Sequence, residues 1–376
     1  MRYLTPYIQK DLEKKMVFLG GPRQVGKTTL AKNIIEKSDS GIYLNWDGLK
    51  DQKKILEQSW YEKDRLIVLD EIHKYPKWKN MVKGFYDTQK DAHQFLVTGS
   101  ARLDVYRRGG DSLLGRYHHW ELHPFSLDEK AFIPKLTEKE IFKRLMTVGG
   151  FPEPFFDNDM RESRRWREER FQKILRDDIR DLEGIRNIQQ MGILLQLLRE
   201  RVGGEVVVAN LARDIQVTSP TILKWIEVFE RMYLIFVIRP YTKKITRSVQ
   251  KPFKVYFYDN ADVIGDEGVI LENLVATHLI KRCRFLQNYT GEKHDLFFLR
   301  DREKREVDFL YTVDGKAVDL IEVKLKETKA SHSLFYMAQI LNPVRAILLS
   351  GERGEHLKKE RFHRMGICEY FMPPLW

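Results

Sequence analysis

The chain has 376 residues, 43% of them hydrophobic, which is too many for one ordinary core and enough for two or three domains. No apolar run approaches the roughly eighteen residues of a membrane span, and the N-terminus lacks the order of a signal peptide, so we expect a cytoplasmic protein without a membrane partner. The formal net charge of +11 indicates a polyanionic partner such as DNA, although excess basic residues can also serve solubility alone. The two cysteines, Cys283 and Cys368, have no paired spacing, which predicts free thiols and argues against a disulfide framework or a zinc site.

The first motif is a phosphate loop. Residues 21–28 match G-x-x-x-x-G-K-[ST] and lie between the apolar run 16–19 and a helix-like run that begins at Thr29. Glycines let backbone N–H groups close around phosphate oxygens, and the following helix N-terminus attracts the anion. The pattern predicts a site for ATP with Mg²⁺, in which Lys27 contacts the β- and γ-phosphates and Thr28 the Mg²⁺. The nucleotide-binding residues are predicted to be Gly21, Pro22, Arg23, Gln24, Val25, Gly26, Lys27, Thr28 and Thr29.

A second motif, residues 65–71, is an apolar run that ends in Asp70 and Glu71. This is the pattern of a buried parallel strand that carries carboxylates to its C-terminal edge. Asp70 is suited to Mg²⁺ or its bound water, and Glu71 to polarising the attacking water. The same pattern also occurs in a buried strand followed by an ordinary acidic turn, but the phosphate loop upstream favours the catalytic interpretation.

A third predicted strand, residues 94–100, ends in small polar residues, which places a hydroxyl near the γ-phosphate. Ser100 is the first candidate for this sensor position and Thr98 the second. Further on, Arg116 lies on a Gly-bearing turn and is a candidate to stabilise phosphoryl-transfer charge in a neighbouring subunit. The rival candidates for that role are Arg102, Arg107 and Arg108.

Six motifs occur in order along the chain and carry a family resemblance. They are Gly-Pro-Arg-Gln-Val-Gly-Lys-Thr-Thr, Leu-Asp-Glu-Ile-His-Lys, Val-Thr-Gly-Ser-Ala-Arg, Leu-Leu-Gly-Arg-Tyr, His-Pro-Phe-Ser and Gly-Gly-Phe-Pro-Glu-Pro. The chain thereby resembles a group of bacterial and archaeal AAA+ ATPases, related to the signalling ATPases, that have a C-terminal domain of uncertain function. The resemblance implies a ring-forming ATPase in which Lys27, Thr28, Asp70 and Glu71 have the roles given above. It also implies that Gly149 to Pro152 lie in a lid near the nucleotide.

Residues 205–238 have the pattern of a winged helix. A short apolar run at 205–208 precedes a helix around 210–214, and a second helix begins near Thr218 or Ser219 as N-cap, with Pro220 in its first turn. The run 234–238 then predicts a strand that leads into basic residues, which are Arg239, Lys243, Lys244, Arg247, Lys251 and Lys254. On the second helix, Thr221 and Lys224 are the polar residues available to DNA. Winged helices in ATPases also serve as packing modules, so DNA contact is one of two interpretations.

The last third of the chain has the pattern of a PD-(D/E)XK nuclease fold. A strand at 306–310 contains Asp308, and the next strand, at 319–324, contains Glu322 and Lys324 on one face. Asp308 and Glu322 are candidate ligands for a divalent cation, Lys324 for orienting water, and Glu272 for completing the ligand set. The family resemblance points to the same fold. Many domains of this fold have lost cleavage and kept DNA or protein binding, so nuclease activity stays open.

The sequence therefore predicts an α/β protein with three parts: an AAA+ P-loop core and helical lid at 1–187, a winged helix at 188–258, and a restriction-endonuclease-like domain at 259–376. The leading hypothesis is a homo-oligomeric, ring-forming ATPase that remodels or translocates duplex or branched DNA. The alternative hypothesis is a nucleotide-gated switch or scaffold whose C-terminal parts bind protein.

Overall fold

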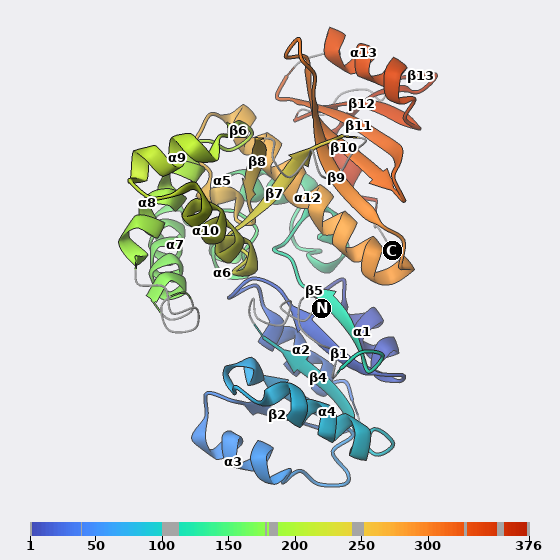
Figure 1. Cartoon of the computed structure of the whole chain (residues 1–376). Coiled ribbons are helices and arrows are strands. Elements are labelled where there is room, and N and C mark those ends of the chain that lie inside the picture. Colours follow the sequence, from blue (N-terminus) through green and yellow to red (C-terminus); the bar gives the residue numbers. More distant parts are fainter. Residues whose placement is uncertain are drawn as a thin grey trace. The chain divides into compact units, whose positions relative to one another are not determined.

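The structure is a computed structural model, shown in Figure 1, and it describes residues 2–38, 40–99, 113–176, 179, 187–242, 252–326, 329–351 and 357–373. The chain forms two compact units. The first contains residues 1–123 and 231–233, and the second contains 124–230 and 234–376. In the described residues, no helix is long and apolar enough to cross a membrane.

The first unit alternates strands and helices. Its strands are β1 (Met16–Gly20), β2 (Gly41–Asn45), β3 (Leu66–Asp70), β4 (Gln94–Thr98) and β5 (Tyr117–Glu121). Its helices are α1 (Thr5–Leu12), α2 (Lys27–Ile35), α3 (Leu49–Glu57), the 3₁₀ helix η1 (Ile72–Lys74) and α4 (Trp78–Gln89). The strands predicted near residues 16, 65 and 94 and the helix predicted after the phosphate loop are confirmed.

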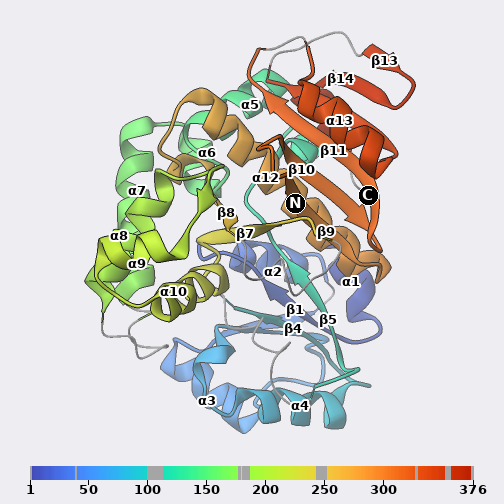
Figure 2. The same ribbon diagram turned by 45° about the horizontal axis from the view of Figure 1, so that its top comes forward.

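All five strands form one parallel sheet in the order β2-β3-β4-β1-β5, and Figure 2 shows β4, β1 and β5 side by side. Every residue of β1 and β3 is buried. The reason is that helices cover both faces: α3 and α4 contribute Ile55, Trp78 and Phe85 to the core on one face, while α1 and α2 contact the strands on the other. Because the strands are parallel, the phosphate loop after β1 and the acids after β3 lie at the same edge.

The second unit begins with a helical segment of η3 (Leu127–Phe132), α5 (Glu138–Thr147), α6 (Pro152–Asp157) and α7 (Met160–Lys173). The buried Lys281 holds the start of this segment, because its ammonium donates to Ser126 (2.5 Å), Asp128 (2.8 Å) and Glu129 (3.0 Å). Beside it, His278 Nε2 accepts from the backbone N–H of Leu127 at 2.9 Å. Desolvation lowers the pKa of His278 to about 4, so this imidazole is neutral near pH 7.

Two glycines of the Gly-Gly-Phe-Pro-Glu-Pro motif make close contacts within the second unit. Gly149 has φ +83°, and a Cβ there would lie 2.1 Å from Oδ1 of Asp259. A Cβ at Gly150 would lie 2.5 Å from the carbonyl oxygen of Phe125, whose N–H donates to the Gly150 carbonyl. These glycines are required by packing inside the unit. Their predicted place near the nucleotide stays a prediction.

Next come α8 (Ile188–Arg199), β6 (Glu205–Val206), α9 (Val208–Ile215), α10 (Ser219–Arg231), β7 (Ile235–Pro240) and β8 (Phe253–Phe257). Strand β8 pairs antiparallel with both β6 and β7. This order of elements and strands is the one expected of a winged helix. Helix α10 forms because Ile222, Trp225 and Ile226 recur at helical spacing and are all buried.

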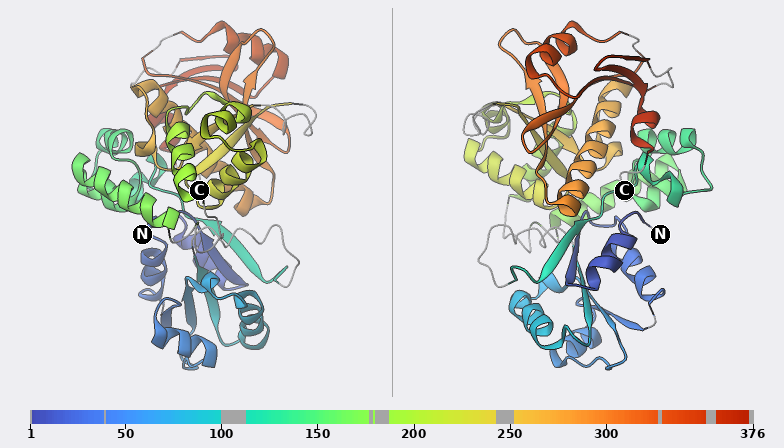
Figure 3. Two further views of the ribbon diagram at one scale, coloured as in Figure 1. Left: turned by 60° about the vertical axis from the view of Figure 1, so that its left-hand side comes forward. Right: turned by 90° about the vertical axis from the view of Figure 1, so that its right-hand side faces the viewer.

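The remaining elements are η5 (Asn260–Asp262), α12 (Glu267–Thr290), β9 (His294–Arg300), β10 (Glu306–Val313), β11 (Lys316–Lys324), α13 (His332–Leu341), β12 (Arg345–Ser350), β13 (Leu357–Lys359), β14 (Phe362–Gly366) and α14 (Ile367–Phe371). As predicted, the strands that contain Asp308 and Glu322 are adjacent, and they pair antiparallel. Helices α12 and α13 pack on this sheet, with Leu334, Met337 and Ala338 of α13 in one of its cores. Figure 3 shows both helices against the strands. The two cysteines are free, as predicted.

One sheet runs through most of the second unit, in the order β13-β14-β12-β11-β10-β9-β7-β8-β6. It is continuous because β7 pairs parallel with β9 through Arg239 and Pro240. Strands β7 and β9, and with them β6, β8 and the C-terminal strands, therefore belong to one hydrogen-bonded sheet. The division between the two compact units falls between residues 123 and 124. The predicted domain boundaries at 187 and 258 stay predictions.

Candidate nucleotide site

The phosphate loop joins the carboxyl end of β1 to the N-terminus of α2. Its first glycine, Gly21, has φ +134°, and a Cβ there would lie 2.3 Å from the carbonyl oxygen of Leu122. Gly26 caps α2 with φ 97°. Both positions need the conformational freedom of glycine, which explains why the motif requires these two residues. The loop thus has the backbone shape that a phosphate cradle needs.

Lys27 is buried inside this loop, with only 7% of its surface exposed. Its ammonium donates to the carbonyl oxygens of Gly21 (2.9 Å) and Pro22 (2.7 Å). Oxygen acceptors of the loop therefore surround the cation at the N-terminus of α2. Phosphate oxygens are acceptors of the same kind and carry negative charge, so this position fits the predicted role of Lys27.

Asp70 accepts three hydroxyl hydrogen bonds at the end of β3. Its Oδ2 accepts from Thr28 Oγ1 at 2.7 Å and from the Tyr43 hydroxyl at 2.6 Å, and its Oδ1 accepts from Thr98 Oγ1. The structure thus brings Thr28 and Asp70, the predicted Mg²⁺ ligands, into direct contact. A hydroxyl and a carboxylate are hard oxygen donors, and Mg²⁺ is typically bound by such groups together with phosphates and water. These residues fit Mg²⁺ with ATP.

Glu71 follows Asp70 in a left-handed backbone conformation with φ 56°, which is uncommon for a residue other than glycine. Its N–H donates to the carbonyl oxygen of Thr98 at 3.0 Å, which ties this turn to β4. The carboxylate lies 3.5 Å from Lys74 Nζ and 3.7 Å from His73 Nε2. Desolvation raises the pKa of Glu71, although Lys27 and Lys74 oppose the shift. A raised pKa makes the carboxylate a better acceptor for a proton from water.

Tyr43 on β2 is a site residue that the sequence analysis missed. It reaches Asp70 because β2 pairs parallel with β3, and the Lys32 ammonium lies 4.6 Å from the centre of its ring. Desolvation raises the pKa of Tyr43 well above its usual value, and the neighbouring Asp70 adds to the shift, so the phenol stays protonated and donates. The available signal was the apolar run 41–45 with one tyrosine, which by itself does not distinguish a packing residue from a hydrogen-bond donor.

Of the candidates for the sensor hydroxyl and the arginine finger, the structure describes Thr98 and Arg116. Ser100, Arg102, Arg107 and Arg108 lie outside the described residues. Thr98, the second sensor candidate, contacts Asp70 directly. Arg116 immediately precedes β5, and its carbonyl accepts from Met16 N–H at the start of β1, so it lies at the sheet edge opposite the phosphate loop. There it forms a two-point ion pair with Asp87, at 2.6 and 3.1 Å. A role of Arg116 in the nucleotide site of a neighbouring subunit stays a prediction.

The four candidate nuclease residues lie on α12, β10 and β11, and one oxygen each of Asp308 and Glu322 accepts from a backbone N–H. Asp308 Oδ2 accepts from Val323 N–H at 2.8 Å, and Glu322 Oε2 from Ser331 N–H at 2.9 Å. Lys324 Nζ lies 3.7 Å from Glu322 Oε1. Across the parts of the chain that the structure describes, no three His, Cys, Asp or Glu side chains are grouped to hold a metal ion. The residues present do not fit the predicted divalent cation.

Lys254 was predicted to belong to an exposed basic cluster, and this prediction is wrong. It is 1% exposed, and its ammonium lies 2.6 Å from Glu306 and 3.5 Å from Glu272. Desolvation works to lower the pKa of Lys254, but Glu272, Asp308 and Glu306 outweigh it and raise the pKa. Desolvation and the Glu272 carboxylate raise the pKa of Asp308 to about 7. Lys254 is a buried ion-pair residue and not part of a DNA-binding surface. Lys243, Lys244, Arg247 and Lys251 lie outside the described residues.

Three segments of the chain match known protein families. Residues 13–131 match the model of an AAA domain, and residues 139–261 and 267–370 match two domains of unknown function. The uncharacterized protein MJ1544 of Methanocaldococcus jannaschii is 26% identical over 364 residues, which covers 87% of this chain and 80% of that protein. MJ1637 of the same organism is 23% identical over 339 residues, covering 74% and 70%.

Three solved structures are similar to the chain at low scores. The Walker-type ATPase PABY2304 of Pyrococcus abyssi has a TM-score of 0.42 and 15% identity, covering 71% of this chain and 94% of that one. The Aeropyrum pernix ORC1 protein, solved in complex with DNA, has a TM-score of 0.36 and 11% identity, covering 75% and 94%. Thermotoga maritima RuvB has a TM-score of 0.32 and 17% identity, covering 66% and 94%.

The AAA match spans the parallel sheet, the phosphate loop and the Asp70–Glu71 turn. The loop geometry and the contact of Thr28 with Asp70 are those that a P-loop ATPase requires. Residues 13–131 therefore contain a P-loop ATPase domain of the AAA type.

Proposed function

We propose that the chain hydrolyses ATP as a ring of identical cytoplasmic subunits and uses the free energy to remodel or move along DNA. The observation that supports hydrolysis most directly is the 2.7 Å contact between Thr28 and Asp70 beside the buried ammonium of Lys27. Bound Mg²⁺ neutralises phosphate charge. Lys27 and the loop N–H groups bind the phosphates, and Glu71 accepts the proton of the attacking water. Ser100 and Arg116 of a neighbouring subunit remain the proposed sensor and arginine finger.

Two features support DNA as the partner. The net charge of +11 favours a polyanion, and the order α8-β6-α9-α10-β7-β8 is that of winged-helix proteins. On α10, Lys224 is exposed and Thr221 is partly exposed, whereas Glu227 on the same helix is exposed and repels phosphate. We therefore place the contact at the N-terminal half of α10, which is also the part of a recognition helix that reaches base edges. This proposal retains the modules 1–187, 188–258 and 259–376, without cleavage.

The test is steady-state ATP hydrolysis with no DNA, linear duplex, single strand or four-way junction, with Glu71→Gln protein as the blank. We expect at least one DNA to stimulate hydrolysis, and we expect rising salt to weaken the stimulation steeply, because phosphate contacts release counterions. Lys224→Glu should raise the DNA concentration needed for half-maximal stimulation about tenfold. Lys316→Glu, which changes an exposed lysine of β11, is the matched control. Equal rates with all four additions would refute the DNA proposal.

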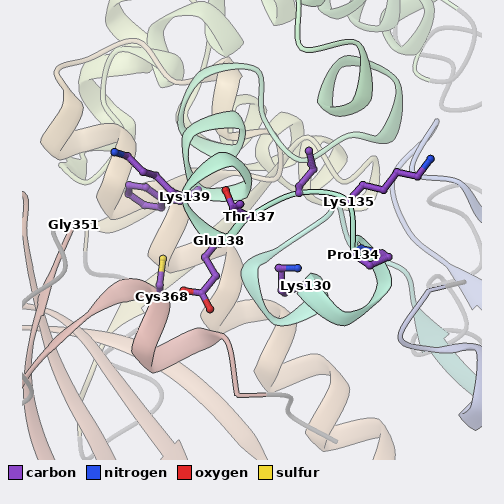
Figure 4. A pocket seen from close by; sticks show the side chains of 10 residues that line it. Lys130, Pro134, Lys135, Thr137, Glu138, Lys139, Gly351 and Cys368 are labelled. Atoms are coloured by element: carbon purple, nitrogen blue, oxygen red, sulfur yellow. The ribbon is translucent and has the colours of Figure 1, made fainter.

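The alternative, a nucleotide-gated scaffold, is favoured by one observation. A hollow of about 940 Å³ lies in the second unit between the segment 130–142 and residues Gly351 and Cys368, as Figure 4 shows. Its lining combines apolar Pro134, Leu136 and Phe142 with one acid, Glu138, and three lysines at positions 130, 135 and 139, so its charge is net positive. Charge complementarity then selects an acidic peptide with apolar residues. Hydrolysis that responds to such a peptide, loses the response in Lys139→Glu, and ignores DNA would favour this alternative.

A further inference from the structure

Lys254, Glu272, Glu306 and Asp308 form a group that the proposed ATPase does not use, and we refer to it as the Lys254 cluster. Its centre is the Lys254 ammonium, 2.6 Å from Glu306 Oε1 and 3.5 Å from Glu272 Oε1. Lys254 comes from β8, Glu272 from α12, and Glu306 and Asp308 from β10. One buried side chain thus contacts elements that are distant in the sequence.

The carboxylates of the cluster have further protein partners. The buried Tyr256 hydroxyl donates to Glu272 Oε1 at 2.7 Å, and Asp308 accepts from Val323 N–H at 2.8 Å. Arg300 Nη1 lies 2.5 Å from Glu306 Oε2, and its Nε lies 3.4 Å from Glu205 of β6. Two oxygens of the predicted cation ligands, Glu272 Oε1 and Asp308 Oδ2, are therefore used by an ammonium, a phenol and a backbone N–H.

The backbone near Glu272 leaves little additional space. Gly203 has φ +76° in the turn before β6, and a Cβ there would lie 2.9 Å from Glu272 Oε2. The cluster therefore also packs against the connection between α8 and β6. A hydrated divalent cation needs six or more oxygen ligands, including waters, whereas a lysine needs only a few acceptors at hydrogen-bond distance. The observed partners and spacing suit the lysine.

We propose that the Lys254 ammonium takes the place of a divalent cation in this acidic set, and that the cluster holds the winged helix and the C-terminal sheet together as one body. The residues Glu272, Asp308, Glu322 and Lys324 then have a structural role and support no metal-dependent cleavage. DNA bound at α10 would act on the C-terminal sheet through this connection and through the pairing of β7 with β9.

The first experiment titrates Mn²⁺ into nucleotide-free full-length protein and counts bound ions by electron paramagnetic resonance. All proteins contain Asp70→Asn, so that the nucleotide site does not contribute. With Lys254 present we expect no saturable Mn²⁺ site that depends on Asp308. Lys254→Ala removes the ammonium beside Glu272 and Glu306, and Mn²⁺ should then bind at least about tenfold more tightly than any Mn²⁺ that the Lys254 protein binds. A Mn²⁺ site in the Lys254 protein that Asp308→Asn abolishes would overturn the proposal.

The second experiment measures thermal unfolding of the second unit in the full chain. Lys254→Met keeps the volume and removes the charge, which leaves partly buried carboxylates without this cation, so we expect the unfolding midpoint to fall on the order of 5–10 °C. Lys316→Met, at an exposed position on β11, should leave the midpoint within about 1 °C. Mn²⁺ should restore part of the loss in Lys254→Ala but not in Lys254→Met. An unchanged midpoint in Lys254→Met would refute the structural role, and ATP hydrolysis by each variant shows that the first unit is intact.

Discussion

The nucleotide site and the Lys254 cluster each combine a lysine with carboxylates, yet their hydrogen bonds differ in kind. At the nucleotide site, Lys27 donates to two backbone carbonyls and Asp70 accepts from three hydroxyls, so both charged groups have neutral hydrogen-bond partners. In the cluster, Lys254 pairs directly with two glutamates. A charged group with neutral partners can still bind a charged ligand, whereas charged groups that pair directly with each other are already neutralised.

The largest effect that tests this comparison is expected for Lys27→Ala. Lys27 donates to the neutral loop carbonyls of Gly21 and Pro22, so the change should lower kcat/KM for ATP by roughly 10³-fold and shift the unfolding midpoint by less than about 3 °C. Lys254→Ala should show the reverse, with hydrolysis retained and the midpoint lowered. Steady-state hydrolysis and thermal melts of both variants measure this contrast. Equal losses of stability in the two variants would break the comparison.

The next largest effect is expected for Glu71→Gln. The amide keeps the size of the side chain but cannot accept the proton of water, so turnover should fall by about 10²–10⁴-fold while the affinity for ATP changes little. Single-turnover hydrolysis and equilibrium binding of a fluorescent ATP analogue separate the two quantities. Turnover at the unaltered rate would remove Glu71 from the mechanism.

A smaller effect concerns His278, a buried neutral group of the second unit. The unfolded imidazole takes up a proton below about pH 6.5, but the folded one does so only near pH 4, where its pKa lies. The unfolded state therefore binds more protons in this window, and stability falls as the pH falls from 6.5 to 4, by up to about 1.4 kcal/mol per pH unit from this residue.

Thermal midpoints at pH 7.0 and 5.0 test this expectation. His278→Gln removes the titrating group while keeping an acceptor for the Leu127 N–H, so the midpoint of the variant should respond less to acid than that of the unaltered protein. His332→Gln, at an exposed position at the start of α13, is the matched control. The same response to acid in the His278 variant and the unaltered protein would contradict a neutral buried imidazole.

The smallest effect is expected for Tyr43→Phe. The ring and its contact with Lys32 remain, but Asp70 loses one hydroxyl donor, which is worth about 1–2 kcal/mol for a charged acceptor. We expect a roughly tenfold lower kcat/KM and a higher Mg²⁺ concentration for half-maximal rate. Tyr61→Phe, at an exposed tyrosine of the same unit, should have no effect. An unchanged Mg²⁺ requirement would assign Tyr43 to packing alone.

The sequence by itself determined the nucleotide site and the order of the elements. The phosphate loop and the Asp70–Glu71 strand are short segments whose chemistry requires fixed residues at fixed spacing, and parallel strands bring them to one edge. The order of α9, α10 and β7 was also predictable, because each element follows a local period of apolar residues. Tyr43 and Arg116 show the limit: one reaches Asp70 and the other Asp87 through strand register and turn placement, which no local pattern specifies.

Tertiary structure alone decided the nature of the C-terminal acidic set. Asp308, Glu322 and Lys324 have the spacing of a nuclease in sequence, and their strands pair as expected. Lys254 reads in sequence as one of several exposed basic residues, and only the pairing of β8 with β6 and β7 brings it under α12 and β10. The charge of a site depends on every group within a few ångströms, whereas a motif records only those that are near in the chain.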